Sequence, residues 1–301
     1  MNIYVTGANG RLGKEFMKLV PKAIPLVRRK SGIKREIVTN FSSSELKRIL
    51  KEANVVVHLA ACLDFDNKKK LYEGNVELTR KIVSATPKNA KIVYASSISV
   101  YGKKLAQIPA NEKTACHPDS DYAKTKYEAE KEILTHKNAV ALRIAAIYGP
   151  QIKDYLKMIK ILHKGKMMLI GEGNNHVPFV HIKDVAKALK NAINAKSGVY
   201  LISANALTQR EIFEIVCREL KISTPIYKIS HALASFLLQA TKFLRKLFKA
   251  GDFLTVEHLS ILAHDRMFDS SKARRELNFK PRTTEDGIKE MVKVYLKGTK
   301  K

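Results

Sequence analysis

The sequence predicts an α/β fold, in which a doubly wound parallel sheet is followed by a smaller, mostly helical lobe. Over the first 150 residues, apolar strand-like runs alternate with helical patterns, as in a parallel sheet whose strands are joined by helices. The run NVVVHLA at 54–60 is almost continuously apolar, which is typical of a central parallel strand covered on both faces. After Gly149 and Pro150 the segments become shorter and mostly helical.

The elements of the first half follow from this periodicity. The first helix ends at Pro21, because proline lacks the N–H that the next turn would need. Three serines before Glu45 have the composition of a helix start. Strands are expected at 2–6, 24–27, 36–39, 54–60, 91–95 and 139–145, and helices at 11–20, 42–52, 67–85 and 121–136. Ligands of such sheets bind at the carboxyl ends of the strands, so site residues are expected there.

The second half is expected to form the substrate lobe. We expect residues 1–150 to form the sheet domain and residues 151–301 to form a lobe interleaved with it, because 176–195 has the pattern of a return to the sheet. Helices are expected at 152–164, 183–194, 208–220, 231–249 and 285–297, and strands at 177–182 and 199–202. The basic amphipathic helix at 231–249 is expected to cover the substrate pocket, with contact to an anionic membrane surface as the alternative.

Composition restricts the partners. The formal net charge is +27, but the lysines are spread along the whole chain and form no basic arm, so nucleic acid is not expected as a partner. There is no run of 18 apolar residues and no signal-peptide pattern before the first strand. The three cysteines, Cys62, Cys116 and Cys217, form no CxxC pair. A cytoplasmic protein is therefore expected.

A glycine-rich loop, TGANGRLG at 6–13, joins the first strand to the first helix. Gly7 permits the tight turn, Gly10 lets the backbone approach a pyrophosphate, and Gly13 lets the helix pack on the strand. The N–H groups at the start of the helix then bind the anion. The remaining loop residues are Asn9, Arg11 and Leu12. This pattern, placed directly after the first strand, predicts a dinucleotide site.

The residues after the second strand indicate which dinucleotide binds. NAD enzymes usually carry an acid there for the ribose 2′-hydroxyl, whereas this chain has Arg28-Arg29-Lys30. The planar guanidinium of Arg28 suits a 2′-phosphate, and Arg11 in the loop could assist it. NADP(H) is therefore favoured, and NAD(H) is the alternative if these arginines are only part of a basic surface.

Three side chains have the pattern of a proton-transfer centre. Tyr122 and Lys126 are four residues apart on one helix and so share a face. A nearby ammonium favours the phenolate and is expected to lower the tyrosine pKa from about 10. Tyr122 would then exchange a proton with an alcohol or carbonyl oxygen. Ser97, after the strand at 91–95, would hydrogen-bond the same oxygen.

These segments together resemble the extended short-chain dehydrogenase/reductase family, also known as the epimerase/dehydratase superfamily. The likeness covers nearly the whole chain through TGANGRLG, NVVVHLAA, YASSISVYG, YAKTK, LRIAAIYGP, FVHIKDVA and FDSSKARRELNFKP. The resemblance implies a Rossmann-like NAD(P)-binding domain and an oxidoreductase or epimerase. It also implies that Ser97 is the catalytic Ser/Thr, Tyr122 the acid/base, and Lys126 the ribose-binding lysine.

The resemblance further implies cofactor contacts at matching positions. The segment Leu59-Ala60-Ala61 matches the family segment that lies along the cofactor. Asn40-Phe41 match the segment that contacts adenine, where the family usually has Asp in place of Asn40. A homodimer through the helices that flank Tyr122 is also implied. The further cofactor residues are Phe41, Leu59, Ala60, Ala61, Asn75, Ile144, Ala146 and Ile147.

Departures from the family pattern favour one branch. Dehydratases carry an Asp-Glu pair after the catalytic residue, where this chain has Ile98 and Ser99, and nucleotide-sugar enzymes often carry Asn at the position of Ala146. Together with Arg28, these residues argue against a dehydratase or an NAD-retaining epimerase. The segments FLTVEHLSILAHDRMFDSSKA and SSISVYG resemble the dihydroflavonol-reductase-like and 3β-hydroxysteroid-dehydrogenase-like branch. The leading hypothesis is an NADP(H)-dependent reductase or dehydrogenase of a secondary alcohol or ketone.

Two alternatives differ from it in class. One is an NAD-dependent nucleotide-sugar 4-epimerase acting on a UDP-sugar, and the other is a non-catalytic NAD(P)-binding sensor or assembly factor. No metal site is expected, because His163, His176 and His181 show no ligand spacing and His58 has the position of a packed strand residue.

Overall fold

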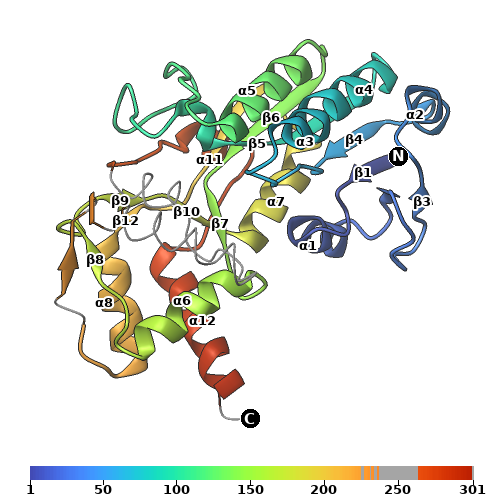
Figure 1. The fold of residues 1–301 in the computed structure, drawn as a ribbon. Coiled ribbons are helices and arrows are strands. Elements are labelled where there is room, and N and C mark those ends of the chain that lie inside the picture. Colours follow the sequence, from blue (N-terminus) through green and yellow to red (C-terminus); the bar gives the residue numbers. More distant parts are fainter. Residues whose placement is uncertain (225–226, 231, 234–235, 237–263, 300–301) are drawn as a thin grey trace.

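The predicted doubly wound sheet is confirmed. The computed structural model describes residues 1–224, 227–230, 232–233, 236 and 264–299, and contains a seven-stranded sheet in the order β11-β6-β5-β4-β1-β2-β3, with every pair parallel (Figure 1). The strands are β1 (Ile3–Thr6), β2 (Ile24–Val27), β3 (Ile37–Val38), β4 (Val55–His58), β5 (Lys91–Ser97), β6 (Ala139–Ile144) and β11 (Gly198–Ile202).

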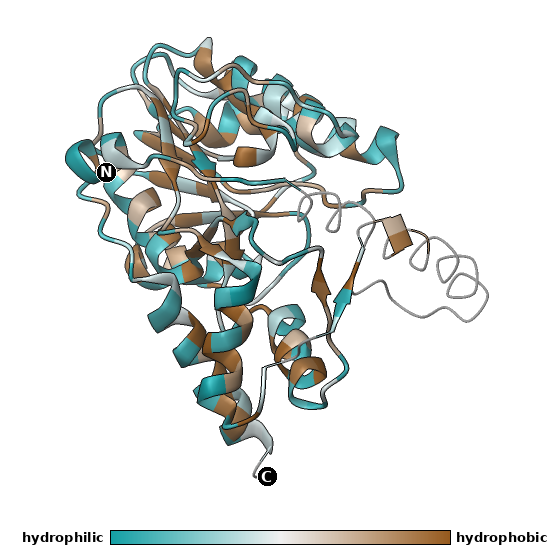
Figure 2. Cartoon of the chain, turned by 90° about the vertical axis from the view of Figure 1, so that its left-hand side faces the viewer, coloured by the Kyte–Doolittle hydropathy of each residue, from teal (hydrophilic) through white to brown (hydrophobic). Residues whose placement is uncertain are grey.

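Helices cover both faces of this sheet, as Figure 1 shows. On one face α2 (Ser43–Leu50), α4 (Leu78–Ala85) and α5 (Asp121–Leu134) pack side by side, and on the other face α1 (Arg11–Leu19) packs against α7 (Ile182–Ala192). The strands are mostly apolar and lie inside the molecule (Figure 2). This layering brings the carboxyl ends of β1, β4, β5 and β6 to one edge.

The helix predicted at 67–85 has an internal irregularity. It consists of α3 (Lys68–Tyr72), the π-helical turn η1 (Glu73–Glu77) and α4. A π turn inserts an extra residue into a helix, and such turns often occur at functional sites. Asn75, in this turn, is hydrogen-bonded to the backbone of Cys62 in the loop after β4.

The return of the chain to the sheet domain extends beyond residues 176–195. Within that range, α7 packs on the sheet, whereas β10 (Phe179–His181) pairs with β7 (Ala146–Tyr148) in a separate two-stranded sheet. The strand expected at 199–202 is the edge strand β11, which continues the ladder of β6. The helix α11 (Ser271–Glu276) also packs on β11.

The lobe has a separate apolar core. In it α6 (Lys153–His163), α8 (Gln209–Leu220) and α12 (Thr284–Thr299) pack against one another (Figure 1). Short strands border them: β8 (Leu169–Ile170), β9 (His176–Val177), β12 (Leu207–Thr208) and β13 (Lys228–Ile229). The helix predicted at 231–249 lies almost entirely outside the described residues.

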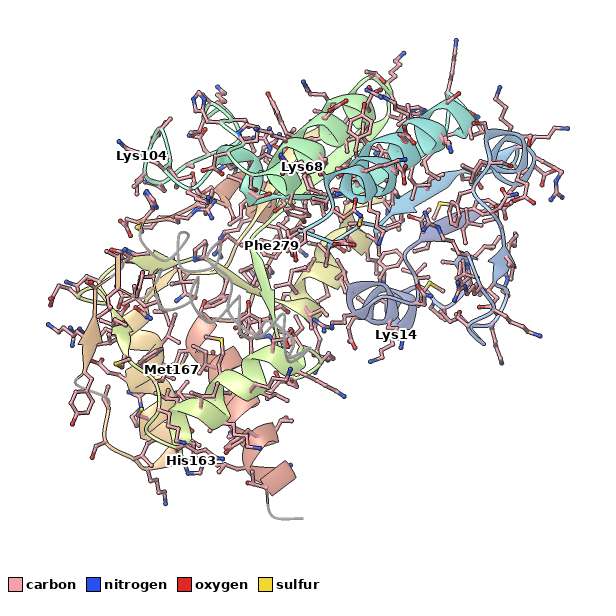
Figure 3. All side chains as sticks on the ribbon, in the orientation of Figure 1. Lys14, Lys68, Lys104, His163, Met167 and Phe279 are labelled. Carbon is pink, nitrogen blue, oxygen red and sulfur yellow. The ribbon has the colours of Figure 1, made fainter. Side chains whose placement is uncertain are left out.

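Lysine side chains project from separate elements of the sheet domain (Figure 3). Lys14, Lys68 and Lys104 lie on different parts of the sheet domain (Figure 3). In the described part of the chain, none of the helices has both the length and the apolar character that crossing a membrane requires.

Candidate active site

The glycine loop is tightly packed against the strand ends. Gly7 has a positive φ of 71°, and a Cβ on it would lie 2.6 Å from the backbone nitrogen of Ala60. A Cβ on Gly13 would lie 2.2 Å from the carbonyl oxygen of Gly7. Only glycine fits these two positions. Gly10 precedes α1 without a side-chain cap, so the first N–H groups of the helix are available to an anion.

The other loop residues differ in their exposure to solvent. Leu12 packs against the core of the sheet domain, and Asn9 is exposed. Arg11 is exposed, and its guanidinium lies 3.8 Å from the carboxylate of Asp154 at the start of α6. The side chain of Arg11 therefore spans the gap between the glycine loop and the lobe.

The end of β2 carries an exposed basic group. Arg28 is exposed, and its guanidinium carbon lies 5.9 Å from the ring centre of the buried Phe41. The backbone N–H of Asn40 donates to the carboxylate of Glu45 over 2.9 Å. The carboxylate of Glu45 thus accepts hydrogen bonds from the segment before α2, at Thr39 and Asn40. Phe41 and Arg28 together form the surface where the adenosine half of a dinucleotide would lie.

Ser97 and Tyr122 meet at the carboxyl end of β5. Ser97 is the last residue of β5, and its hydroxyl accepts the backbone N–H of Ser99 over 3.1 Å. Tyr122 lies in the first turn of α5, and the Ser97 hydroxyl is near enough to its phenol to lower the Tyr122 pKa. Phe65, which is 53% exposed, packs edge-on against the Tyr122 ring at 5.4 Å between centroids. The Tyr122 ring thus has an exposed apolar neighbour.

Lys126 lies behind this pair and is 2% exposed. Its ammonium donates to the carbonyl oxygen of Ala95 over 2.7 Å and lies 4.1 Å from the ring centre of Tyr94. Burial lowers the pKa of Lys126 to about 7, and the negative charge of Glu130 partly opposes this change.

The expected lowering of the tyrosine pKa is wrong for this arrangement. Burial raises the pKa of Tyr122 to about 12, and the hydrogen bond from Ser97 offsets only part of the increase. The Lys126 ammonium points to Ala95 and Tyr94 instead. The shared helix face is present, but spacing alone does not determine where the ammonium points.

A buried ion pair that the sequence analysis did not identify supports α5. Arg143 on β6 binds Glu130 at 2.7 Å, and Ser96 donates to the same carboxylate at 2.5 Å. Arg143 also donates to the hydroxyl of Tyr101 over 2.7 Å. The sequence does contain an indication of this ion pair, because an arginine within the apolar strand AVALRIA requires a buried partner.

The remaining candidate residues line the same edge of the sheet. Leu59, Ala60 and Ala61 follow β4, with Ala61 exposed. Asn75 is 2% exposed, and its amide is engaged by the backbone of Cys62 and by Thr125. Ile144 ends β6, and Ala146 and Ile147 form β7.

The histidines are separate from one another. His58 is fully buried between Thr6 and Thr79, and its pKa is lowered to about 3, mainly by burial and also by the charge of Lys126. His176 pairs with Asp265, whereas His181 lies beside Glu290. Among the described residues, no group of three His, Cys, Asp or Glu side chains is arranged to hold a metal ion.

The geometry fits a nicotinamide dinucleotide. The glycine cradle leaves no room for a side chain at Gly7 or Gly13, the start of α1 has no side-chain cap, and Ser97 and Tyr122 lie at the same sheet edge. Gly7, Gly10 and Gly13 would hold the pyrophosphate, and Arg28 with Phe41 would flank the adenosine.

Comparison with known proteins agrees with this assignment. A family model described as the NAD dependent epimerase/dehydratase family matches residues 3–203. UDP-glucose 4-epimerase of Vibrio cholerae is 24% identical, with 98% of this chain and 95% of that protein aligned. UDP-glucuronate 4-epimerase 2 of Arabidopsis thaliana is 30% identical over 74% of this chain, but only 52% of that longer protein is covered.

A solved structure has the same fold over the whole chain. It is UDP-glucuronic acid 4-epimerase from Bacillus cereus in complex with NAD, and it aligns with a TM-score of 0.75 and 18% identity over 99% of each chain. At this identity the likeness shows the fold alone.

Proposed function

Because this chain belongs to the NAD-dependent epimerase/dehydratase family, within the extended short-chain dehydrogenases/reductases, we propose that it is an NAD-dependent 4-epimerase of a nucleotide sugar. The two curated relatives named above are UDP-sugar 4-epimerases, and one of them aligns with nearly the whole chain. A solved relative carries NAD. This is the function that the sequence analysis placed second, behind NADP(H)-dependent reduction of a ketone.

The side chains present suit reversible oxidation of one carbinol carbon. Tyr122 would accept the hydroxyl proton of the substrate and later return it, while Ser97 donates a hydrogen bond to the same oxygen. Lys126, whose pKa is lowered to about 7 by burial, lies one helical turn from Tyr122 and can gain or lose a proton near neutral pH. When bound, the nicotinamide supplies the hydride acceptor and donor.

The observation that carries the proposal is a complete oxidation centre without a group for elimination. Ser97 adjoins Tyr122, whereas the next two positions after Ser97 hold the buried Ile98 and the half-buried Ser99. Neither side chain is a carboxylate that could remove a proton from the carbon beside the reacting centre. Inversion needs only oxidation and reduction at one carbon, so the site is sufficient for a 4-epimerase.

A second candidate, the NADP(H)-dependent ketone reductase, is favoured by different observations. Arg28 is exposed at the end of β2, where a 2′-phosphate would be recognised. The lobe contains a cavity of about 100 Å³ whose lining includes Met158, Met167 and Phe179. An apolar lining suits an apolar substrate better than a sugar diphosphate.

The experiment that separates the two begins with the nucleotide carried by the purified protein. Release by heat and mass spectrometry identify it, and UDP-glucose, UDP-glucuronic acid and UDP-N-acetylglucosamine are then followed by NMR. Bound NAD with 4-epimer formation and no net NADH supports the epimerase. Exchangeable NADPH, consumed only when ketones are added, would replace it with the reductase. The Tyr122→Phe variant serves as the inactive control in both assays.

A further inference from the structure

A continuous chain of buried hydrogen bonds joins the glycine loop to the helix that carries Tyr122. It starts at Thr6, the residue before Gly7, whose hydroxyl lies 2.6 Å from Nδ1 of His58. Nε2 of His58 lies 3.0 Å from the hydroxyl of Thr79 on α4. Thr79 donates to the carbonyl oxygen of Asn75 at 2.5 Å. The chain therefore crosses β1, β4, α4 and η1.

The direction of each bond follows from the inventory of donors. Thr79 uses its only hydroxyl proton on the carbonyl of Asn75, so its oxygen must accept from Nε2 of His58. Nδ1 of His58 then accepts from Thr6, whose oxygen accepts the N–H of Ala60 at 3.2 Å. Burial lowers the pKa of His58 to about 3, so the ring is neutral and only the Nε2–H tautomer satisfies the chain.

Asn75 extends the chain to the catalytic helix. Its Oδ1 accepts the N–H of Cys62 at 2.7 Å, and its Nδ2 donates to the carbonyl of Cys62 at 3.3 Å. The same Nδ2 donates to the hydroxyl of Thr125 at 3.1 Å, which in turn donates to the carbonyl oxygen of Tyr122 at 2.9 Å. Both amide protons of Asn75 are thus used within the chain.

We infer that His58, Thr79 and Asn75 are positioning residues that hold the glycine loop and the first turn of α5 in one fixed relation. This inference rests on the proposed function, because that relation places the Tyr122 hydroxyl against a dinucleotide held by Gly7 and its neighbours. All three side chains are at most 2% exposed. The amide of Asn75, expected from the family resemblance to contact the cofactor, is engaged by Cys62 and Thr125. The three residues therefore act on the site through Thr6 and Thr125.

The decisive change is Thr79→Val, which keeps the branched shape and removes the hydroxyl. We expect kcat to fall about tenfold to a hundredfold, because a displacement of about 1 Å at a reacting group costs on that order. KM should stay within about threefold, since uniform binding is unchanged. Thr79→Ser restores the hydroxyl and should recover most of kcat.

Thr86→Val is the matched control. Thr86 caps the same helix, is buried, and donates to the carbonyl oxygen four residues back, Ile82, at 2.7 Å, but it has no part in the chain. Thr86→Val removes a buried hydroxyl from the same helix as Thr79→Val does, and we expect the two variants to lose similar amounts of stability. An equal loss of kcat in Thr79→Val and Thr86→Val would overturn the inference, as would full activity in Thr79→Val.

A second readout needs no substrate. Amide hydrogen exchange of the NAD-bound protein should become faster in Thr79→Val for peptides that contain Gly7–Gly13 and Tyr122–Lys126, and should not change in Thr86→Val. Faster exchange confined to α4 would contradict the inference. If Thr79→Val does not fold, Thr125→Val replaces it, because Thr125 is the last side chain in the series of hydrogen bonds before Tyr122. If the wild type converts no UDP-sugar, the proposed function fails while the exchange result still decides the role of the chain.

Discussion

The ammonium of Lys126 donates a hydrogen bond to the carbonyl oxygen of Ala95 over 2.7 Å. This bond, together with the ring of Tyr94 at 4.1 Å, holds the buried amine of Lys126 against β5, the strand that ends at Ser97. Lys126 is thus part of the packed interior as well as of the site. Its charge has consequences for both stability and chemistry.

The first consequence is a pH-dependent stability. Burial lowers the pKa of Lys126 from its ordinary 10.5 to about 7. Between these values the unfolded chain binds more protons than the folded one, so this residue makes stability rise with pH across the window. In Lys126→Met the contribution is absent. Urea unfolding at pH 6.5, 8 and 9.5 should show the wild type gaining stability relative to the variant. Parallel pH profiles for the two proteins would contradict the prediction.

Tyr122→Phe should remove turnover while leaving the dinucleotide bound. The hydroxyl contacts Ser97, not the glycine loop, and general acid/base catalysis contributes about 10²–10⁴-fold. Tyr127→Phe on the same helix is the control, because its ring packs with Lys131 away from the hydroxyl pair. Steady-state kinetics and NAD titration of both variants make the comparison. Turnover of Tyr122→Phe within tenfold of the wild type would exclude Tyr122 as the acid/base.

Gly7→Ala should abolish dinucleotide binding. The new Cβ would meet the backbone nitrogen of Ala60 at 2.6 Å, and a positive φ adds strain of about 1–2 kcal/mol. Gly32→Ala separates crowding from strain, since Gly32 also has a positive φ but has nothing within 4 Å of the added atom. Calorimetric titration with NAD should show binding lost only in Gly7→Ala. Normal binding in Gly7→Ala would mean that the loop does not hold the pyrophosphate.

Glu130→Gln should destabilise the fold strongly. The change leaves Arg143 buried without its countercharge, and breaking a buried pair costs about 3–5 kcal/mol. Glu132→Gln, on the same helix, removes the partner of the more exposed Arg80 and should cost less than about 1 kcal/mol. Chemical unfolding of both variants at pH 7 measures the difference. If the two variants lose similar amounts of unfolding free energy, the buried pair contributes no more to stability than the exposed one.

Much of the fold could be predicted because its signals are local. The apolar run of β4, the uncapped start of α1 after Gly10, and the four-residue spacing of Tyr122 and Lys126 are all present in short windows. The placement of β11 could not be predicted in the same way. Its pattern is that of any short strand, and only its register with β6, more than fifty residues earlier in the chain, makes it an edge of the main sheet.

By itself, the sequence determined the doubly wound sheet, the glycine loop and the identity of the Ser97, Tyr122 and Lys126 side chains, because periodicity and motif spacing act over a few residues. The tertiary structure decided the direction of the Lys126 ammonium, the raised pKa of Tyr122 and the buried chain through His58. These depend on desolvation and on bonds between residues as far as 54 positions apart in the chain. Burial of that kind exists only after distant segments have packed together.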